Sequence, residues 1–332
     1  MNALTALFRP EPALNAPRFD GRPGHVESYF VRLNDPARPR AVWFKQTVLA
    51  PLQGEAVAES WVIFFDGARV VADKVTVPWS QAQYGDPHVT TPAMALTVGG
   101  VGGARGTIAQ VQFDVNWDRP DSTSSAPLQL YPWRALRVGP FPRSKLNTPA
   151  PWIVARGTLV VAGEQVDVTG WTGSQGHNWG REHSFEYAWG QAVFPGADAV
   201  LEGFTGRVRV AGRTTPRMSA LVVRRDGREW RFDRIFDPWR QEQHVDADRW
   251  EIRLRSHDGE AHLVMDSRDR AQACLGYLNP DGAMSYCFNS KLARVQLEVF
   301  PSDGARFELT SEHGGALEFL RREPDPRFTR VV

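Results

Sequence analysis

Five Asp-Gly pairs that lie between apolar-patterned runs constrain the fold of this chain more than any other feature of its sequence. They begin at Asp66, Asp226, Asp258, Asp281 and Asp303, and each lies between runs of apolar-patterned residues. Asp-Gly supplies the positive φ angles that a tight hairpin turn requires. The pairs therefore predict β-hairpins along the chain and an all-β fold.

The residues around these turns alternate between apolar and polar side chains. Trp250, Ile252 and Leu254 share one face of residues 249–255, with charged side chains on the other, and residues 296–299 repeat the pattern. A period of two is typical of half-buried antiparallel strands. No window of helical length shows an apolar face, so we expect little helix. Further strands are expected at 25–33, 40–49, 57–65, 69–77, 107–117, 157–169, 187–194, 199–210 and 217–225.

The length of 332 residues favours two domains. Between about 118 and 151 the composition changes to the Pro, Ser and Asp of turns and linkers. We predict a boundary near the end of this stretch, with an N-terminal domain over 1–152 and a C-terminal domain over 153–332. Each half has about the length of one lipocalin-like antiparallel β-barrel.

The composition excludes several classes of partner. The net charge of +1 gives no electrostatic reason to expect nucleic acid or an anionic membrane. There is no apolar stretch of transmembrane length and no signal-peptide pattern, so we expect a cytoplasmic protein that contacts membranes only to take up substrate. Cys274 and Cys287 form neither a disulfide framework nor a zinc motif. A hydrophobic small molecule is the expected partner.

The segment 171–191, W-T-G-S-Q-G-H-N-W-G-R-E-H-S-F-E-Y-A-W-G-Q, holds the densest set of chemically competent side chains. It mixes imidazoles and carboxylates with large aromatic residues, a combination that suits the wall of an apolar pocket with a few placed polar groups. Alternation from Phe185 puts Tyr187, Trp189 and Gln191 on one face and Glu186 on the other. An alternative is that the aromatic residues fill a barrel and the polar groups satisfy buried backbone.

Other chemistries fit the sequence poorly. His177 and His183, with Glu182 and Glu186, offer metal-ligand atoms, but their spacing matches no known metal motif, so no metal site is predicted. The glycine-rich run from Val98 lacks a phosphate-loop ending and reads as a hairpin. The G-S-Q-G sequence is not a nucleophile elbow, because that turn requires G-x-S-x-G.

Two carboxylates in the first half share a face with apolar side chains. Glu59 lies on the side of Trp61 and Ile63, and Asp73 on the side of the valines around it. A carboxyl group in such surroundings keeps its proton near neutrality, as a general acid must. The alternative is a carboxylate at a strand end that leans into solvent.

The quoted segment resembles a known family. Residues Gly176 to Gly180 (G-H-N-W-G) and Tyr187 to Gln191 (Y-A-W-G-Q) are similar to motifs shared by tocopherol cyclase, carotenoid hydratase (hydroxyneurosporene synthase) and AttH-type proteins, including some lipocalin-like Diels-Alderases. Weaker support comes from Ala41 to Gln46, Glu59 to Trp61 and Tyr286 to Ala293. The resemblance implies two lipocalin-like barrels packed side by side, an apolar pocket near their junction, and no metal or organic cofactor.

Together, these observations predict a cofactor-independent enzyme, a hydratase (lyase) or cyclase (isomerase), acting on an isoprenoid-like or polyketide-like molecule. Glu182 is the expected acid, followed by Glu59 and Asp73, with His177 or His183 as its proton partner or as the base for water. The alternatives are a non-catalytic carrier of a lipophilic ligand and a scaffolding protein with a vestigial pocket. The expected ligand-binding residues are Asn178, Trp179, Glu186, Tyr187, Trp189, Gln191, Trp61 and Trp43.

Overall fold

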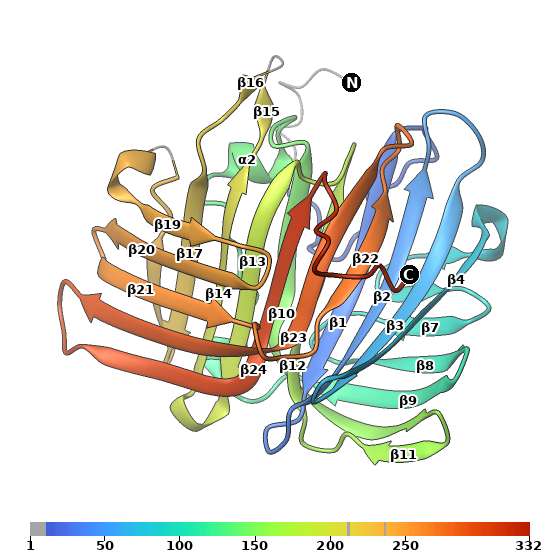
Figure 1. Cartoon of the computed structure of the whole chain (residues 1–332), viewed down its shortest axis with the longest axis horizontal. Helices are drawn as coiled ribbons and strands as arrows, with labels where there is room; N and C mark the ends of the chain where they lie inside the picture. The colour runs from blue at the N-terminus through green and yellow to red at the C-terminus, as the bar shows by residue number, and fades with distance from the viewer. Residues whose placement is uncertain (1–10, 211–212, 236) are drawn as a thin grey trace.

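Two large antiparallel sheets lie side by side in the computed structural model, which describes residues 11–210, 213–235 and 237–332 (Figure 1). The first sheet runs in the order β4-β3-β2-β1-β12-β10-β9-β8-β7-β6-β5, with β11 also paired to β10. Its strands are β1 (His25–Asn34), β2 (Arg40–Ala50), β3 (Val57–Asp66), β4 (Arg69–Pro78), β5 (Gln83–Tyr84), β6 (His88–Thr90), β7 (Met94–Thr97), β8 (Gly102–Ile108), β9 (Val111–Asp118), β10 (Ser144–Val161), β11 (Glu164–Asp167) and β12 (Thr172–Gly180).

The second sheet repeats much of this order as β18-β17-β14-β13-β24-β23-β21-β20-β19, with β22 paired to β23. Its strands are β13 (Glu186–Phe194), β14 (Ala199–Arg207), β17 (Met218–Arg225), β18 (Arg228–Phe232), β19 (Glu242–Val245), β20 (Arg249–Ser256), β21 (Gly259–Asp266), β22 (Ala273–Leu278), β23 (Met284–Pro301) and β24 (Phe307–Arg321). A small ribbon, β15 (Arg209–Val210) with β16 (Arg213–Thr214), projects beside it. The helix α2 (Arg134–Val138) is a single short turn in the described residues.

Each sheet curls around its own apolar core, and a third apolar cluster fills the space between the sheets. Phe44 and Trp117 lie in the first core, and Trp250 and Phe288 in the second. The third cluster joins residues of both halves, including Trp43, Trp61, Trp152, Trp189, Val200 and Leu320. The side chains that face away from each curl are therefore also buried, because the other sheet covers them.

The hairpin prediction is confirmed at all five Asp-Gly pairs. Asp66, Asp226 and Asp258 close the β3–β4, β17–β18 and β20–β21 turns. Asp281 and Asp303 lie in the connections from β22 to β23 and from β23 to β24. The all-β, lipocalin-like architecture with little helix is confirmed as well.

Three expected strands are interrupted in the structure. Residues 199–210 divide at Val208 into β14 and β15, which belong to different sheets. Residues 107–117 cross a turn at Ala109, and residues 157–169 cross another at Ala162; both alanines adopt positive φ. The boundary expected between residues 152 and 153 falls inside β10, and the chain passes from one sheet to the other between Gly180 and Glu186. The Pro-rich stretch before residue 151 lies between β9 and β10, two paired strands of one sheet, so it does not separate the halves.

Within residues 11–210, 213–235 and 237–332, no helix is both long and apolar enough to cross a bilayer.

Candidate functional site

A pocket of about 150 Å³ opens where the two sheets meet. The first sheet contributes Phe30 from β1 and Trp43 from β2, and the second sheet contributes Tyr187 and Trp189 from β13. Apolar residues of the connection between β9 and β10, such as Leu130 and Leu136, close another side. Most of the wall is aromatic or aliphatic, so polar groups that reach the pocket act in a largely dry environment.

A buried ion pair lies at the wall formed by the second sheet. The Nζ of Lys291 on β23 lies 2.5 Å from Oε1 of Glu318 on β24, and both side chains are almost completely buried. The amide of Asn289 donates to the same oxygen at 3.1 Å, and the hydroxyl of Tyr187 donates to Oε2 at 3.4 Å. Glu318, which lines the pocket, is thus a carboxylate stabilised by a cation and two hydrogen-bond donors.

Lys45 on β2 faces this carboxylate cluster from the wall formed by the first sheet. The side chain is 3% exposed, lines the pocket, and has its Nζ 3.8 Å from the centre of the Tyr277 ring. The rings of Trp43 and Trp61 lie 5.5 and 5.6 Å away. Burial lowers the pKa of Lys45 to about 8, against the opposing influence of Cys287 and Glu318.

Two further residues lie next to this group. The His183 ring stacks at an angle on Tyr277, with 5.0 Å between centroids. Burial, followed by repulsion from Lys45 and Arg322, lowers the pKa of His183 to about 3, so its imidazole is neutral at physiological pH. Burial also raises the pKa of the Cys287 thiol well above its usual range. A neutral imidazole accepts or relays a proton, whereas this thiol stays protonated.

The structure brings seven of the residues predicted from sequence to the pocket. These are Trp43, Asn178, Trp179, His183, Glu186, Tyr187 and Trp189. The expected alternation of β13 also holds, because Tyr187 and Trp189 face the space between the sheets while Ala188 lies in the core of the second sheet. The G-H-N-W-G motif forms the end of β12, and the turn follows at residues 181–185.

His177 lies outside the pocket lining and ties the N-terminal segment to the first sheet. Its Nδ1 is 2.7 Å from the backbone oxygen of Leu14, its Nε2 is 2.8 Å from Oε1 of Glu27, and its ring stacks on Tyr29. Burial alone would raise the pKa of Glu27, but hydrogen bonds from His177 and His25 hold it well below its usual range. This arrangement gives His177 a structural role.

The three expected acids also lie away from the pocket lining. Glu182 is within 3.5 Å of an Arg143 nitrogen and 3.8 Å of an Arg322 nitrogen. Glu59 pairs with Lys74 at 2.9 Å, and Asp73 accepts the backbone N–H of Lys74. In the structure, each of these carboxylates is engaged in local contacts.

Gln191 and Trp61 are buried between the sheets. Gln191 accepts from Nε of Arg32 at 2.8 Å and donates to the Pro151 oxygen at 2.7 Å, so it connects β1, β10 and β13. Burial lowers the pKa of Arg32 to about 9, opposed by Glu202. The Trp61 ring lies edge-on to Tyr277, at 5.9 Å between centroids.

Lys45, Tyr277 and Glu318 were not singled out from the sequence. Lys45 belongs to the A-V-W-F-K-Q motif, in which a charged residue interrupts an otherwise apolar strand two positions after Trp43. That position is a usable signal, because a lysine on the same strand face as a buried tryptophan is expected to be buried as well. Glu318 offers no such signal without knowledge that Lys291 lies opposite it.

Among the described residues, no group of three or more His, Cys, Asp or Glu side chains is placed so that it could hold a metal ion.

The chain consists of two curled lipocalin-type sheets with a pocket at their junction, and solved AttH-like structures share this fold. The chain is similar to an AttH-like protein of Nitrosomonas europaea (13% identity, TM-score 0.57, 90% of this chain and 92% of that chain covered). It is also similar to CghA, solved with Sch210972 (12%, 0.59, 90% and 88%), and to kievitone hydratase from Nectria haematococca (10%, 0.54, 91% and 90%).

Sequence relatives are found in Mycobacterium tuberculosis. Two uncharacterized proteins from different strains are each 25% identical to this chain over 287 residues, covering 85% of it and 84% of their own length. No protein-family model matches the chain. At these levels of identity the solved structures establish the fold, and the function must be argued from the pocket.

Proposed function

We propose that this protein is a cofactor-independent enzyme that hydrates, cyclises or isomerises a hydrophobic small molecule in the pocket between the two sheets. The observation that carries the proposal is the placement of Glu318, Lys45 and Tyr187 together in a pocket whose wall is mostly aromatic or aliphatic. A simple carrier needs no buried carboxylate base beside its ligand, since burying a charged group costs free energy. Proton-transfer chemistry requires such groups.

Each group has a separate role in this proposal. Glu318 is the base, because its carboxylate lines the pocket and is held in place by the contact with Lys291. Tyr187, hydrogen-bonded to Glu318, passes a proton to or from the ligand. Lys45, on the opposite wall, stabilises negative charge that develops on the ligand. The aromatic walls exclude water and hold the ligand in one orientation.

The relatives of known structure point in the same direction. One of the solved structures is named a hydratase, and another holds a small molecule. Both belong to chains that share this fold over about nine-tenths of their length. Here the base-and-cation arrangement supports proton abstraction or water activation better than protonation by the carboxylates first expected from sequence.

The test follows small molecules by mass. The protein is incubated in D₂O with a small-molecule extract of cells that produce it. Hydration in D₂O adds one D₂O to a compound and leaves one deuterium bound to carbon, and cyclisation or isomerisation changes its retention time. We expect Glu318→Gln to lower the rate about 10²- to 10⁴-fold, the usual contribution of a general base. Bound compounds that the wild type returns unchanged and without deuterium would instead indicate a carrier.

Two further variants make the result interpretable. Glu312→Gln changes an exposed carboxylate on the same strand and is expected to leave the rate unchanged. The double variant Lys291→Met/Glu318→Gln removes both charges of the buried pair, so it avoids an unpaired cation that could unfold the protein. A folded double variant with wild-type turnover would contradict the role of Glu318.

A further inference from the structure

The charges that line the pocket do not balance within the protein. Both carboxylates of the lining have cationic partners: Glu318 pairs with Lys291 at 2.5 Å, and Glu186 with Arg217 at 2.8 Å. The two lysines of the lining, Lys45 and Lys145, have no carboxylate within 4.0 Å among the described residues. The pocket therefore presents uncompensated positive charge.

Lys45 is the more exceptional of the two lysines. Lys145 donates to the backbone oxygens of Leu136 and Pro142, at 2.7 and 3.0 Å. In the described structure Lys45 has no hydrogen-bond acceptor of its own, although only 3% of its surface is exposed. Its surroundings are the faces of Tyr277, Trp43 and Trp61.

Aromatic rings compensate a buried ammonium group only in part. A cation–π contact stabilises an ammonium group by less than the effective penalty for taking that ion out of water. Buried charges in proteins are normally paired. Lys45 lines the pocket and makes no ion pair within 4.0 Å in the described structure, so it is arranged to receive an anionic group from a ligand.

We propose that the ligand of this pocket carries one acidic group, a carboxylate or an ionised enol or phenol, on a hydrophobic body, and that Lys45 binds this group. The inference rests on the proposed function, since it takes the same pocket as the ligand site. It narrows the substrate class from hydrophobic molecules in general to hydrophobic acids. It also places the acidic end of the ligand at the wall of β2 and Tyr277.

The experiment compares two fluorescent dyes with the same ring system, anilinonaphthalene sulfonate and the uncharged phenylnaphthylamine. We expect the wild type to bind the sulfonate at least about tenfold more tightly than the neutral dye, as for one charge-assisted hydrogen bond. Lys45→Met should reduce this ratio to about one while changing the dissociation constant of the neutral dye less than about threefold. Lys45→Arg, which retains the charge, should keep the preference.

Lys74→Met is the matched control. Lys74 also lies over the Trp61 ring, but it pairs with Glu59 and is absent from the pocket lining, so its loss should leave the dye ratio unchanged. Lys45→Met should also fold at least as well as the wild type, because it removes an unpaired buried charge.

The outcomes separate this inference from the proposed function. A wild type that binds both dyes equally, or a Lys45→Met variant that keeps the full preference for the sulfonate, overturns the inference and leaves the pocket as a ligand site. Failure of both dyes to bind overturns the pocket as a ligand site, and the inference with it.

Discussion

A single carboxyl group, Glu202 on β14, illustrates how the interior of this protein controls ionisation. Its Oε1 accepts from Thr148 at 2.8 Å and from Trp189 at 3.0 Å, and its Oε2 has no partner in the described structure. Burial raises the pKa of Glu202 to about 7, although these hydrogen bonds act to lower it. Because Trp189 forms part of the pocket wall, Glu202 holds that wall from behind.

Replacement of Glu202 should make stability less dependent on pH. The pKa of Glu202 is about 7 in the folded protein and 4.5 ordinarily. Its protonated carboxyl group therefore contributes fully to the free energy of unfolding below pH 4.5, and this contribution is lost as the pH rises to 7. One pH unit between these values corresponds to about 1.4 kcal/mol, so the wild type should lose about 3 kcal/mol across the window. Glu202→Gln should lack this loss, as measured by urea unfolding at pH 5 and pH 8. If the free energy of unfolding changed equally between pH 5 and pH 8 in the two proteins, the raised pKa of Glu202 would be contradicted.

Sequence reasoning at the level of residues succeeded where a side chain's role follows from its own strand. The alternation of β13 correctly placed Tyr187 and Trp189 on one face. Lys45, Glu318 and Tyr277 meet only because strands distant in the chain pack together. An apolar strand face packs either in the core of its own sheet or against the other sheet, and the sequence does not distinguish the two. For this reason Glu59 and Asp73 were expected in a pocket.

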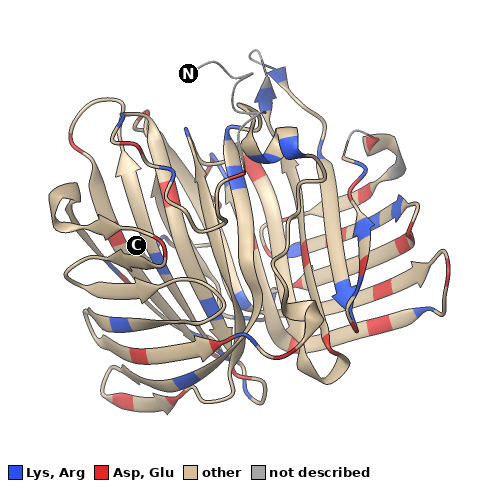
Figure 2. Cartoon of the chain, turned by 180° about the vertical axis from the view of Figure 1, so that it is seen from behind, with Lys and Arg blue, Asp and Glu red and all other residues tan. Residues whose placement is uncertain are grey.

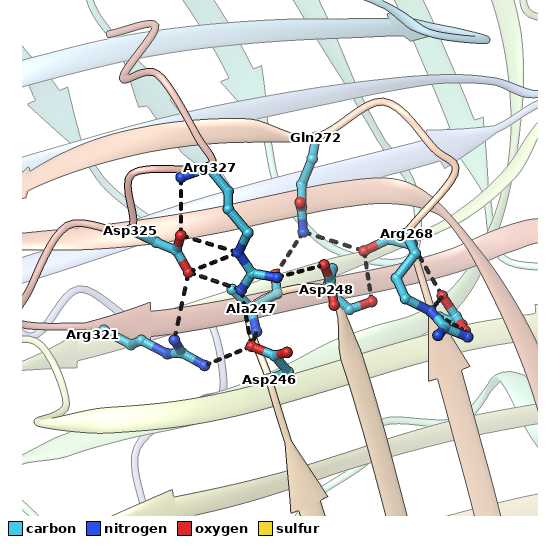
Figure 3. A network of polar contacts seen from close by, with 10 residues as sticks. Asp246, Ala247, Asp248, Arg268, Gln272, Arg321, Asp325 and Arg327 are labelled. Carbon is cyan, nitrogen blue, oxygen red and sulfur yellow. Dashed lines mark hydrogen bonds and ion pairs between the residues drawn. The ribbon is translucent and has the colours of Figure 1, made fainter.

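One element, the C-terminal segment after β24, is attached by a network of charges (Figure 3). Arg327 contacts Asp325 at 2.8 Å, Asp246 at 2.9 Å and Asp248 at 3.1 Å, and Arg321 approaches two of the same carboxylates. The segment then pairs with β22, where the N–H of Val331 donates to the oxygen of Cys274. The network thus ties the segment to the turn between β19 and β20.

Arg327→Ala should loosen this segment without unfolding the protein. Three carboxylates would lose their shared cation, so we expect faster hydrogen exchange at the amides of Val331 and Gly276, which bond across β22 and the C-terminus. The free energy of global unfolding should fall by about 1 kcal/mol or less, since the ion pairs are partly exposed. Arg294→Ala, at another exposed ion pair, is the control and should leave both amides protected. Unchanged exchange in Arg327→Ala would show that backbone pairing alone holds the segment.

Elements bounded by strong turn signals were predictable, and elements around the junction of the halves were not. Asp-Gly pairs marked hairpins because the turn residues themselves supply the required φ angles. The Pro-rich approach to β10 resembles a linker because proline lacks an N–H for a sheet ladder. In the structure β10 nevertheless begins at Ser144 and runs through Pro149 and Pro151, with register shifts against β12 at those positions.

The molecule as a whole has no strongly charged face in the view of Figure 2, where acidic and basic residues are intermixed along the strands. What joins its halves is apolar packing, supplemented by buried hydrogen bonds such as that from Arg32 on β1 to Gln191 on β13. A shared core of this kind couples the unfolding of the two sheets.

Thermal unfolding should therefore occur in a single transition. Separation of the sheets would expose the cluster around Trp43, Trp152 and Leu320 to water, so neither half gains stability by remaining folded alone. Calorimetry, with circular dichroism and tryptophan fluorescence as independent probes, should give coincident midpoints. Two resolved transitions would show that the cluster between the sheets contributes little to stability.

The repeated strand order has a consequence for the history of this site. β4-β3-β2-β1-β12-β10-β9 and β18-β17-β14-β13-β24-β23-β21 follow one plan, as expected if an ancestral gene encoded one curled sheet and was duplicated. A lone sheet supplies either the wall with Lys45 or the wall with Glu318, never both. On this account the site formed after the duplication and is younger than the fold that carries it. Substitutions that alter the site then occur in two sheets that diverge independently of each other.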